Sequence, residues 1–323
     1  METNSRTDRR EFLRQAIGVA GAMGLTSKLP AVARGAFAAE GPDISFPAAP
    51  RDRISVASYP FREFIAGRRE EGGVAGKMAI KDFGAHVAAK FGVRHIEPWS
   101  AHFSSLEPDY LAELSATLAA AGVGIANIAV DGKHSPYAPE KNERAQAIAF
   151  CGAWIDAAAA IHAPGIRTNI PRAKAAELNV ERAAETLRQI ADYGASRNIV
   201  VNLENDNPVS EDPYFLVNVI EKAGTPWLRA LPDFGNTLTA HPPPYAYDGL
   251  AKMFAHAYGI CHVKAMEEDG KGDLVHVDLD RAFSILRASG FRGYCSMEFD
   301  SPGDPYAGTR DLIQKSLKAL AAS

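Results

Sequence analysis

Four residues of types that bind metal ions lie at or near the ends of four successive hydrophobic runs. They are Glu204, Asp233, His262 and Glu298. If the runs are neighbouring parallel strands, their carboxyl ends meet at one rim of the sheet. Three carboxylates gathered there would repel one another strongly unless a cation neutralised them. Oxygen and imidazole donors suit Mn²⁺, Mg²⁺, Co²⁺ or Zn²⁺. The sequence therefore predicts a site for one divalent metal ion.

Alternation of polar and apolar residues within these runs indicates which side chains face the inside of the fold. In the run 198–204, apolar residues alternate with Asn202 and Glu204, so these two polar side chains share one face. The same alternation places His262 and Lys264 together in the run 259–264, and Glu298 on the corresponding face of the last run. A single acid of this kind usually caps a helix or is solvated. Four ligand types in phase on adjacent strands favour a shared site.

The elements that must position these residues repeat eight times. Short runs rich in Val and Ile alternate with helical patterns, such as the stripe Ile80, Phe83, Val87 and Phe91. A glycine commonly precedes the next run, as expected for a residue that ends helices. The runs span residues 54–59, 93–97, 124–131, 165–170, 198–204, 228–233, 259–264 and 293–299, and the glycines are Gly92, Gly122, Gly194, Gly224, Gly259 and Gly290.

Eight such units predict a single-domain α/β fold, a (β/α)8 TIM barrel over residues 53–323. The competing fold is an open, doubly wound parallel sheet. That fold would be expected to carry a glycine-rich phosphate-binding turn after its first strand, and residues 58–61, with the sequence SYPF, are not such a turn.

The first residues of the chain resemble a twin-arginine export signal. Arg9 and Arg10 precede a short apolar run at 16–25, and the small-residue pattern AFA follows at 36–38. We therefore expect a signal peptide over residues 1–38, a linker over 39–52, and a periplasmic or otherwise extracytoplasmic protein with no stable membrane anchor after cleavage. The alternative is a basic disordered tail.

Composition excludes several classes of function. The 323 residues carry a formal net charge of −4, so no basic surface is available to hold a phosphate backbone and we expect no nucleic-acid partner. The 46% of hydrophobic residues exclude a largely disordered chain. Three scattered cysteines are too few for a disulfide framework or a paired-cysteine zinc site.

Four short motifs resemble the xylose isomerase-like TIM-barrel family of sugar (phosphate) isomerases and epimerases. They are NLEN at 202–205, LPDFGN at 231–236, CHVK at 261–264 and SME at 296–298. The family also contains inosose dehydratases, ketose 3-epimerases and the zinc endonucleases of abasic-site repair. The resemblance implies that the four predicted ligands bind one divalent metal. It further implies that Glu204 and Glu298 flank the substrate carbon as an acid/base pair.

Two positions depart from the family pattern. Members often carry a histidine that touches substrate where this chain has Asn236, and an aspartate where it has Ala265. Asn236 keeps a hydrogen-bonding group and removes a proton carrier, which argues against the multi-zinc endonuclease site.

Further candidates for substrate binding come from the same alternation and from strand ends. By resemblance, Lys264 orients substrate or a carboxylate ligand, and Asn236 contacts substrate. Glu97 faces inward and could bind sugar hydroxyls, or pair instead with Arg167, which also faces inward. Trp99 follows a strand, where aromatic side chains stack on sugars or simply pack at the rim.

These observations predict a metal-dependent isomerase or epimerase acting on a small carbohydrate, a free sugar or keto-sugar, by proton transfer through an enediolate. A keto-sugar or keto-glycoside lyase or dehydratase using the same metal and glutamate pair is the alternative. A non-catalytic sugar-binding barrel and a metal-free aldolase using Lys264 as a Schiff base are less favoured. The acidic residues 267–269, after the seventh run, would repel a phosphate group. A homo-oligomer is left open.

Overall fold

The computed structural model describes residues 41–68, 73–174 and 176–322. The predicted signal peptide, residues 1–38, lies outside this part of the chain. Among the residues described, no helix is both long enough and apolar enough to cross a membrane.

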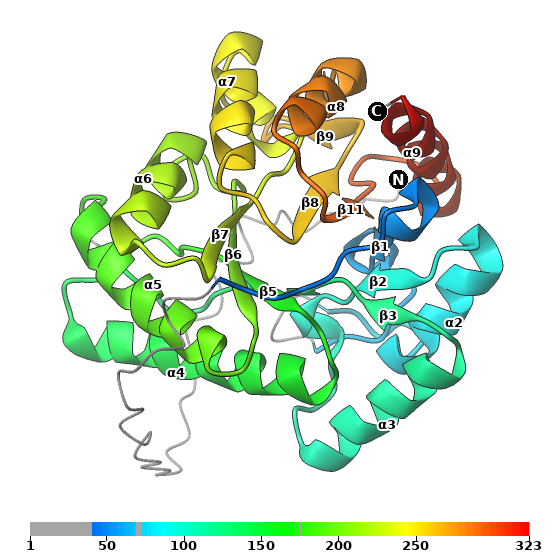
Figure 1. The fold of residues 1–323 in the computed structure, drawn as a ribbon, viewed down its shortest axis with the longest axis horizontal. Helices are drawn as coiled ribbons and strands as arrows, with labels where there is room; N and C mark the ends of the chain where they lie inside the picture. The colour runs from blue at the N-terminus through cyan, green and yellow to red at the C-terminus, as the bar shows by residue number, and fades with distance from the viewer. Residues whose placement is uncertain (1–40, 69–72, 175, 323) are drawn as a thin grey trace, which may run out of the picture.

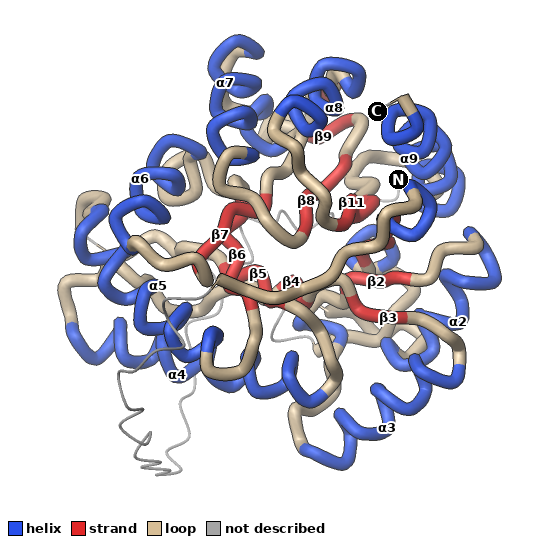
Figure 2. Tube along the Cα trace, viewed as in Figure 1, coloured by secondary structure: helices blue, strands red, loops and turns tan. Residues whose placement is uncertain are grey.

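Parallel strands form the centre of the molecule and helices surround them (Figures 1 and 2). The strands are β1 (Ile54–Ala57), β2 (His95–Glu97), β3 (Gly124–Ile125), β4 (Ile128–Ala129), β5 (Gly165–Thr168), β6 (Val200–Glu204), β7 (Leu228–Leu231), β8 (Ile260–Val263) and β11 (Tyr294–Met297). The helices are α2 (Ile80–Phe91), α3 (Pro108–Ala120), α4 (Lys141–Ala160), α5 (Val180–Ala195), α6 (Pro213–Ala223), α7 (Pro243–Phe254), α8 (Leu279–Ala288) and α9 (Pro305–Ala321).

The sheet closes on itself through two short contacts. Hydrogen bonds order one part as β3-β2-β1-β11-β8 and the other as β4-β5-β6-β7. Parallel bridges between Trp99 and Ala129 and between Asp233 and His262 join the two parts. All eight predicted runs therefore become neighbouring positions of one cylinder. The predicted TIM barrel is confirmed, and the open doubly wound sheet is excluded.

The third predicted strand, residues 124–131, is interrupted. Its first residues, β3, pair with β2, whereas its later residues, β4, pair with β5. Ala126 and Asn127 lie between the two ladders. The later residues also stay beside the second strand, through the bridge between Ala129 and Trp99. Strict alternation fails across the break because Ala126 and Asn127 lie between the two regular ladders.

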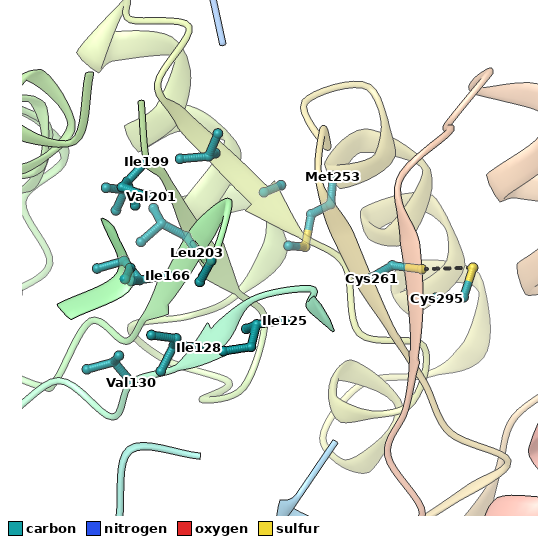
Figure 3. Packing of buried hydrophobic residues seen from close by; sticks show 14 of the residues in the cluster. Ile125, Ile128, Val130, Ile166, Ile199, Val201, Leu203, Met253, Cys261 and Cys295 are labelled. Carbon is teal, nitrogen blue, oxygen red and sulfur yellow. Dashed lines mark hydrogen bonds between the residues drawn. The ribbon is translucent and has the colours of Figure 1, made fainter. Parts of the chain in front are cut away.

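Apolar strand residues fill the space between the cylinder and the helices (Figure 3). Val201 and Leu203 of β6 are fully buried there, as the alternation predicts. Cys261 and Cys295 lie opposite each other on β8 and β11; both thiols are free and buried, with their Sγ atoms 3.8 Å apart. The outward face of these strands thus supplies the core, which leaves the inward face for polar groups.

Two of the predicted helix-ending glycines act differently. Gly92, Gly122, Gly224 and Gly290 have positive φ, as expected for such positions, whereas Gly194 and Gly259 do not. Gly194 lies inside α5, where a Cβ atom would approach the carbonyl oxygen of Ile199 to 2.5 Å. Gly194 is therefore required for close contact with the chain entering β6, and not for a left-handed turn.

A two-stranded antiparallel hairpin, β9 (Met266–Glu268) and β10 (Leu274–His276), follows β8. It extends the loop after the seventh barrel strand at the carboxyl end of the cylinder. Glu267 of this hairpin forms a bridge with Asp300, which follows β11. The hairpin therefore places an acidic side chain beside the predicted metal site.

Candidate metal centre

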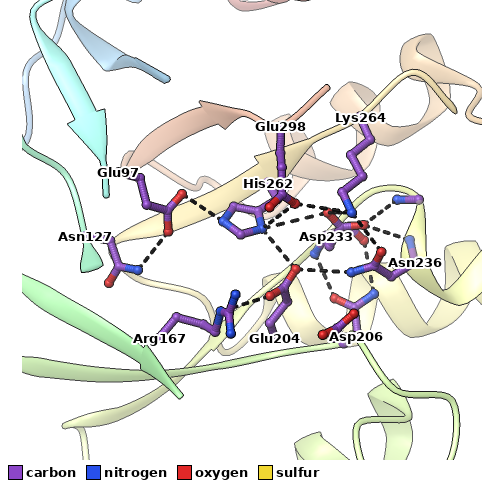
Figure 4. Close-up of polar contacts among 12 residues, drawn as sticks. Glu97, Asn127, Arg167, Glu204, Asp206, Asp233, Asn236, His262, Lys264 and Glu298 are labelled. Carbon is purple, nitrogen blue, oxygen red and sulfur yellow. Dashed lines mark hydrogen bonds and ion pairs between the residues drawn. The ribbon is translucent and has the colours of Figure 1, made fainter. Parts of the chain in front are cut away.

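The four predicted ligands meet at the carboxyl end of the barrel (Figure 4). Glu204 ends β6, Asp233 follows β7, His262 lies on β8 and Glu298 follows β11. One donor atom of each lies within 4.8 Å of those of the other three, and all four residues are buried. The structure thus brings together the set that the sequence singled out.

His262 stands at the centre of this group. Its Nδ1 atom lies 2.9 Å from Glu204 Oε1, 3.2 Å from Glu298 Oε2 and 3.9 Å from Asp233 Oδ2. Burial lowers its pKa, and the carboxylates of Glu97, Glu298 and Glu204 raise it, so that the pKa stands well above its usual value. Without an ion, the imidazolium therefore donates from both ring nitrogens.

Asp233 is oriented by its own loop. Asp233 Oδ1 accepts hydrogen bonds from the backbone N–H groups of Gly235 (2.8 Å) and Asn236 (2.7 Å). Its other oxygen, Oδ2, is buried and accepts no hydrogen bond from the described residues. A buried carboxylate oxygen that accepts no hydrogen bond and lies near three other potential ligand atoms is suited to bind a cation. Burial raises the pKa of Asp233 to about 6, although the Lys264 ammonium opposes this.

Lys264 supplies a positive charge next to the ligands. Its Nζ atom lies 2.7 Å from Glu267 Oε2 and 3.2 Å from Glu298 Oε2, and it donates to Asn236 Oδ1 at 2.9 Å. Burial lowers its pKa, but Asp233, Glu267 and Glu298 raise it well above its usual value. A Schiff base requires a neutral amine, so these contacts weigh against the aldolase alternative.

Arg167 holds the opposite side of the site. Its Nε atom lies 3.0 Å from Glu204 Oε2, and its guanidinium donates to Asp131 Oδ1 at 2.6 Å. Burial raises the pKa of Glu204, but the positive charges of His262 and Arg167 lower it to about 2. Glu204 is therefore ionised at neutral pH and available as a ligand or a base.

The protein itself neutralises part of the acidic charge, which the sequence argument did not anticipate. Burial raises the pKa of Glu267 to about 8, so Glu267 is left out of the balance. The other acids in and beneath the site still outnumber the bases: the carboxylates are Glu97, Glu204, Asp233 and Glu298, and the bases are Arg167, His262 and Lys264. The remaining negative charge and the set of three carboxylates and one imidazole fit a single divalent cation.

The other sequence-predicted residues lie around this centre in different ways. Asn236 donates to Glu204 Oε1 at 3.1 Å and so connects that ligand to Lys264. Glu97 is fully buried and contacts His262 and Asn127, whereas Arg167, its expected alternative partner, contacts Glu204 instead. These positions leave the predicted roles in substrate binding as predictions.

Trp99 lies at the rim and is largely buried. Its indole Nε1 donates to Asp131 Oδ2 at 2.8 Å, and its ring meets Tyr59 edge-on with centroids 5.1 Å apart. Packing therefore accounts for its position, and stacking on a sugar stays a prediction.

Three residues of the centre were missed. Asp131 ends the third predicted run, and this strand-end position was the available signal. Asn127 was hidden by the break between β3 and β4. Glu267 was interpreted only as part of an acidic loop, but it contacts Lys264 three residues earlier in the chain.

A sequence model of the family described as xylose isomerase-like TIM barrel matches residues 85–322. Among curated proteins, no match was found. Solved structures that share the fold include a xylose isomerase-like TIM barrel protein from Mycobacterium smegmatis in complex with magnesium. That protein is 19% identical, with a TM-score of 0.62, over 83% of this chain and 96% of its own.

Two further solved structures carry named activities. D-psicose 3-epimerase from Clostridium cellulolyticum H10, solved with D-tagatose, is 14% identical, with a TM-score of 0.61, over 84% of this chain and 97% of its own. A probable 3-DHS dehydratase from Bacillus anthracis is 16% identical, with a TM-score of 0.60, over 83% of this chain and 98% of its own. At these identities, the likeness establishes a shared fold.

Proposed function

Because this chain belongs to the xylose isomerase-like TIM barrel family, we propose that it is a divalent-metal-dependent isomerase or epimerase acting on a free sugar or keto-sugar. The observation that carries this proposal is the placement of two glutamates on either side of one imidazole. Glu204 and Glu298 approach His262 Nδ1 to 2.9 and 3.2 Å from different strands. Two carboxylates converging on one point are suited to act on one carbon from two sides.

A bound dication would supply Lewis-acid stabilisation of negative charge on the sugar oxygens. The residues of the chain perform the proton transfers. Glu204, kept ionised by Arg167 and His262, removes the proton next to the carbonyl group, giving an enediolate. Glu298, which enters this cycle carrying a proton, delivers that proton to the opposite face, which inverts the carbon. Proton exchange with the solvent then restores both glutamates. Lys264 and Asn236 hold these two glutamates in position.

The charge around the site favours an unphosphorylated substrate. Glu267 and Asp300 form a bridge in the loops after β8 and β11. Burial raises the pKa of Glu267 to about 8, so this residue is largely neutral at pH 7, and neither acid offers the positive charge that holds a phosphate group. Phosphate groups bind the corresponding loops of many TIM barrels, and negative charge there would repel them. Export by the twin-arginine signal predicted in residues 1–38 would likewise bring the enzyme to free sugars outside the cytoplasm.

A lyase or dehydratase is the second candidate. If a leaving group lies β to the carbanion, the same base and the same ion would promote its elimination. The likeness to a probable 3-DHS dehydratase shows that this fold also accommodates a protein named for such chemistry.

The Mn²⁺-loaded full chain is incubated with a panel of free sugars and keto-sugars in D₂O and is then removed. Proton NMR of the remaining sugars tests the proposal. Exchange of a carbon-bound proton for deuterium with inversion or isomerisation is the expected result. Loss of a fragment would establish the lyase instead. Binding without exchange or elimination would contradict both and indicate a sugar-binding barrel.

A further inference from the structure

A continuous chain of side-chain hydrogen bonds runs beneath the metal ligands. Asn202 of β6 donates to Asn127 Oδ1 at 3.3 Å, and Asn127 donates to Glu97 Oε1 at 2.9 Å. Glu97 Oε2 lies 2.8 Å from His262 Nε2. All four residues are at most 1% exposed. Figure 4 shows Glu97 between Asn127 and the far side of the His262 ring.

The direction of these hydrogen bonds is fixed at one end by the backbone. Asn202 Nδ2 also lies 3.2 Å from the carbonyl oxygen of Ile166, which can only accept. The amide nitrogen of Asn202 must therefore face Ile166 and Asn127, and the Asn127 oxygen must accept. This leaves the Asn127 NH2 group pointing at Glu97.

The direction of these hydrogen bonds then determines which ring nitrogen of His262 carries the proton. Glu97, as a carboxylate, accepts from Asn127 through one oxygen and from His262 through the other. The proton of this second hydrogen bond must lie on His262 Nε2, since Glu97 has none to give. The Nδ1 atom is the one that faces Glu204, Asp233 and Glu298.

We propose that this buried chain, which begins at the Ile166 carbonyl, holds His262 with Nε2 protonated and so presents the Nδ1 lone pair to the metal ion. Glu97 is a positioning residue in this arrangement, and Asn127 and Asn202 orient it. Histidines that bind metals generally donate their second ring N–H to such a partner, and loss of the partner weakens metal affinity. The inference rests on the metal site of the proposed function and is independent of its reaction.

The variant Glu97→Gln tests the inference with almost no change in shape. The glutamine NH2 group must face either Asn127, where it meets another NH2 group, or His262, where it moves the ring proton to Nδ1. Either arrangement opposes metal binding. We expect the affinity of the full chain for Zn²⁺, measured by competition with a chelator, to fall about 10- to 100-fold.

A second substitution restores the donor-to-acceptor direction of these buried hydrogen bonds. In Glu97→Gln with Asn127→Asp, the new carboxylate accepts from Asn202 and from the glutamine NH2 group, and the glutamine oxygen again accepts from His262 Nε2. The net charge equals that of the wild type. We expect this double variant to regain most of the Zn²⁺ affinity lost in Glu97→Gln, which a residue needed only for packing would not produce.

Nitrogen-15 NMR of the histidine side chains in the Zn²⁺-loaded full chain gives a readout that does not depend on activity. The wild type and the double variant should show a proton bonded to Nε2 of His262, assigned by its absence in His262→Asn. Unchanged Zn²⁺ affinity in Glu97→Gln, or a double variant no better than the single one, would overturn the inference. A wild type that binds Zn²⁺ in this way without acting on any sugar would overturn the proposed reaction alone.

Discussion

At the scale of single residues, three of the four ligands of the candidate metal centre are held by neighbours that lie far away in the sequence. Arg167 fixes Glu204, the Asn205 side chain accepts from the backbone of Asp233, and Glu97 fixes His262. Such supporting contacts keep buried carboxylates ordered and ionised where charge alone would separate them. Removal of one acid/base group should therefore affect chemistry more than folding.

Replacement of Glu298 by glutamine removes one member of the proposed acid/base pair and keeps its size. We expect turnover to fall by about 10²- to 10⁴-fold, the usual contribution of a general acid or base. Initial rates on the substrate found by NMR measure the effect. Glu185→Gln, on the exposed face of α5, is the matched control and should keep full activity. Full activity in Glu298→Gln, with its fold intact by circular dichroism, would refute the assignment.

At the scale of elements, the site depends on loops and strands that hold one another in place. Glu211 joins the loops after β5 and β6: its oxygens accept from the backbone N–H groups of Ile170 (2.7 Å) and Asn207 (2.8 Å). These loops also carry Asn169 and Asp206, whose side chains are hydrogen bonded to each other. Glu211 therefore orders the rim next to Glu204.

Glu211 should make the stability of the protein depend on pH. Burial, and then the nearby Asp206, raise its pKa well above the ordinary 4.5. Above pH 4.5 the unfolded chain releases this proton while the folded chain retains it, so stability falls as pH rises toward the folded pKa. Glu211→Gln lacks this penalty. Thermal unfolding from pH 5 to 8 should show the Tm of the variant rising relative to the wild type, and a difference that stays constant with pH would contradict the account.

The contact between α5 and the start of β6 gives a second prediction at this scale. Alanine is usually favoured over glycine within a helix by about 1 kcal/mol. At Gly194, however, the added Cβ would lie 2.5 Å from the Ile199 carbonyl oxygen, and we expect Gly194→Ala to destabilise the protein by about 1–3 kcal/mol.

Gly152→Ala in α4 is the matched control, because its Cβ would meet only the Tyr193 ring at 3.7 Å. This variant should be neutral or more stable. Denaturant titration should therefore give a clearly lower free energy of unfolding for Gly194→Ala than for Gly152→Ala. Equal values would show that close packing at Gly194 does not matter.

Regular strands made much of this arrangement predictable. Alternation placed Glu204 and His262 on the inner face, because β6 and β8 are unbroken ladders. It failed at Asn127, which lies in the break between β3 and β4. The contacts of Lys264 with Glu267 and of Arg167 with Asp131 depend on how loops return over the rim, which period-2 patterning does not describe.

At the scale of the whole molecule, the barrel separates two tasks. Outward side chains such as Leu203 and Val263 build the core against the helices, and inward ones such as Glu204 and His262 build the polar centre. Closure of the cylinder brings β6, β7, β8 and β11 to one rim, which no pair of strands could do alone. A divalent ion at this rim is the central claim, since both proposed chemistries and the role of Glu97 depend on it.

The number of Mn²⁺ ions bound per full-length chain tests this claim most directly. Chelator-treated protein is dialysed to equilibrium against micromolar Mn²⁺ at neutral pH and analysed for metal content. We expect one ion per chain for the wild type and a strongly reduced content for Asp233→Asn, which loses the carboxylate that carries the buried Oδ2. A wild type that retains no ion, or an Asp233→Asn variant that binds Mn²⁺ equally well, would contradict the account.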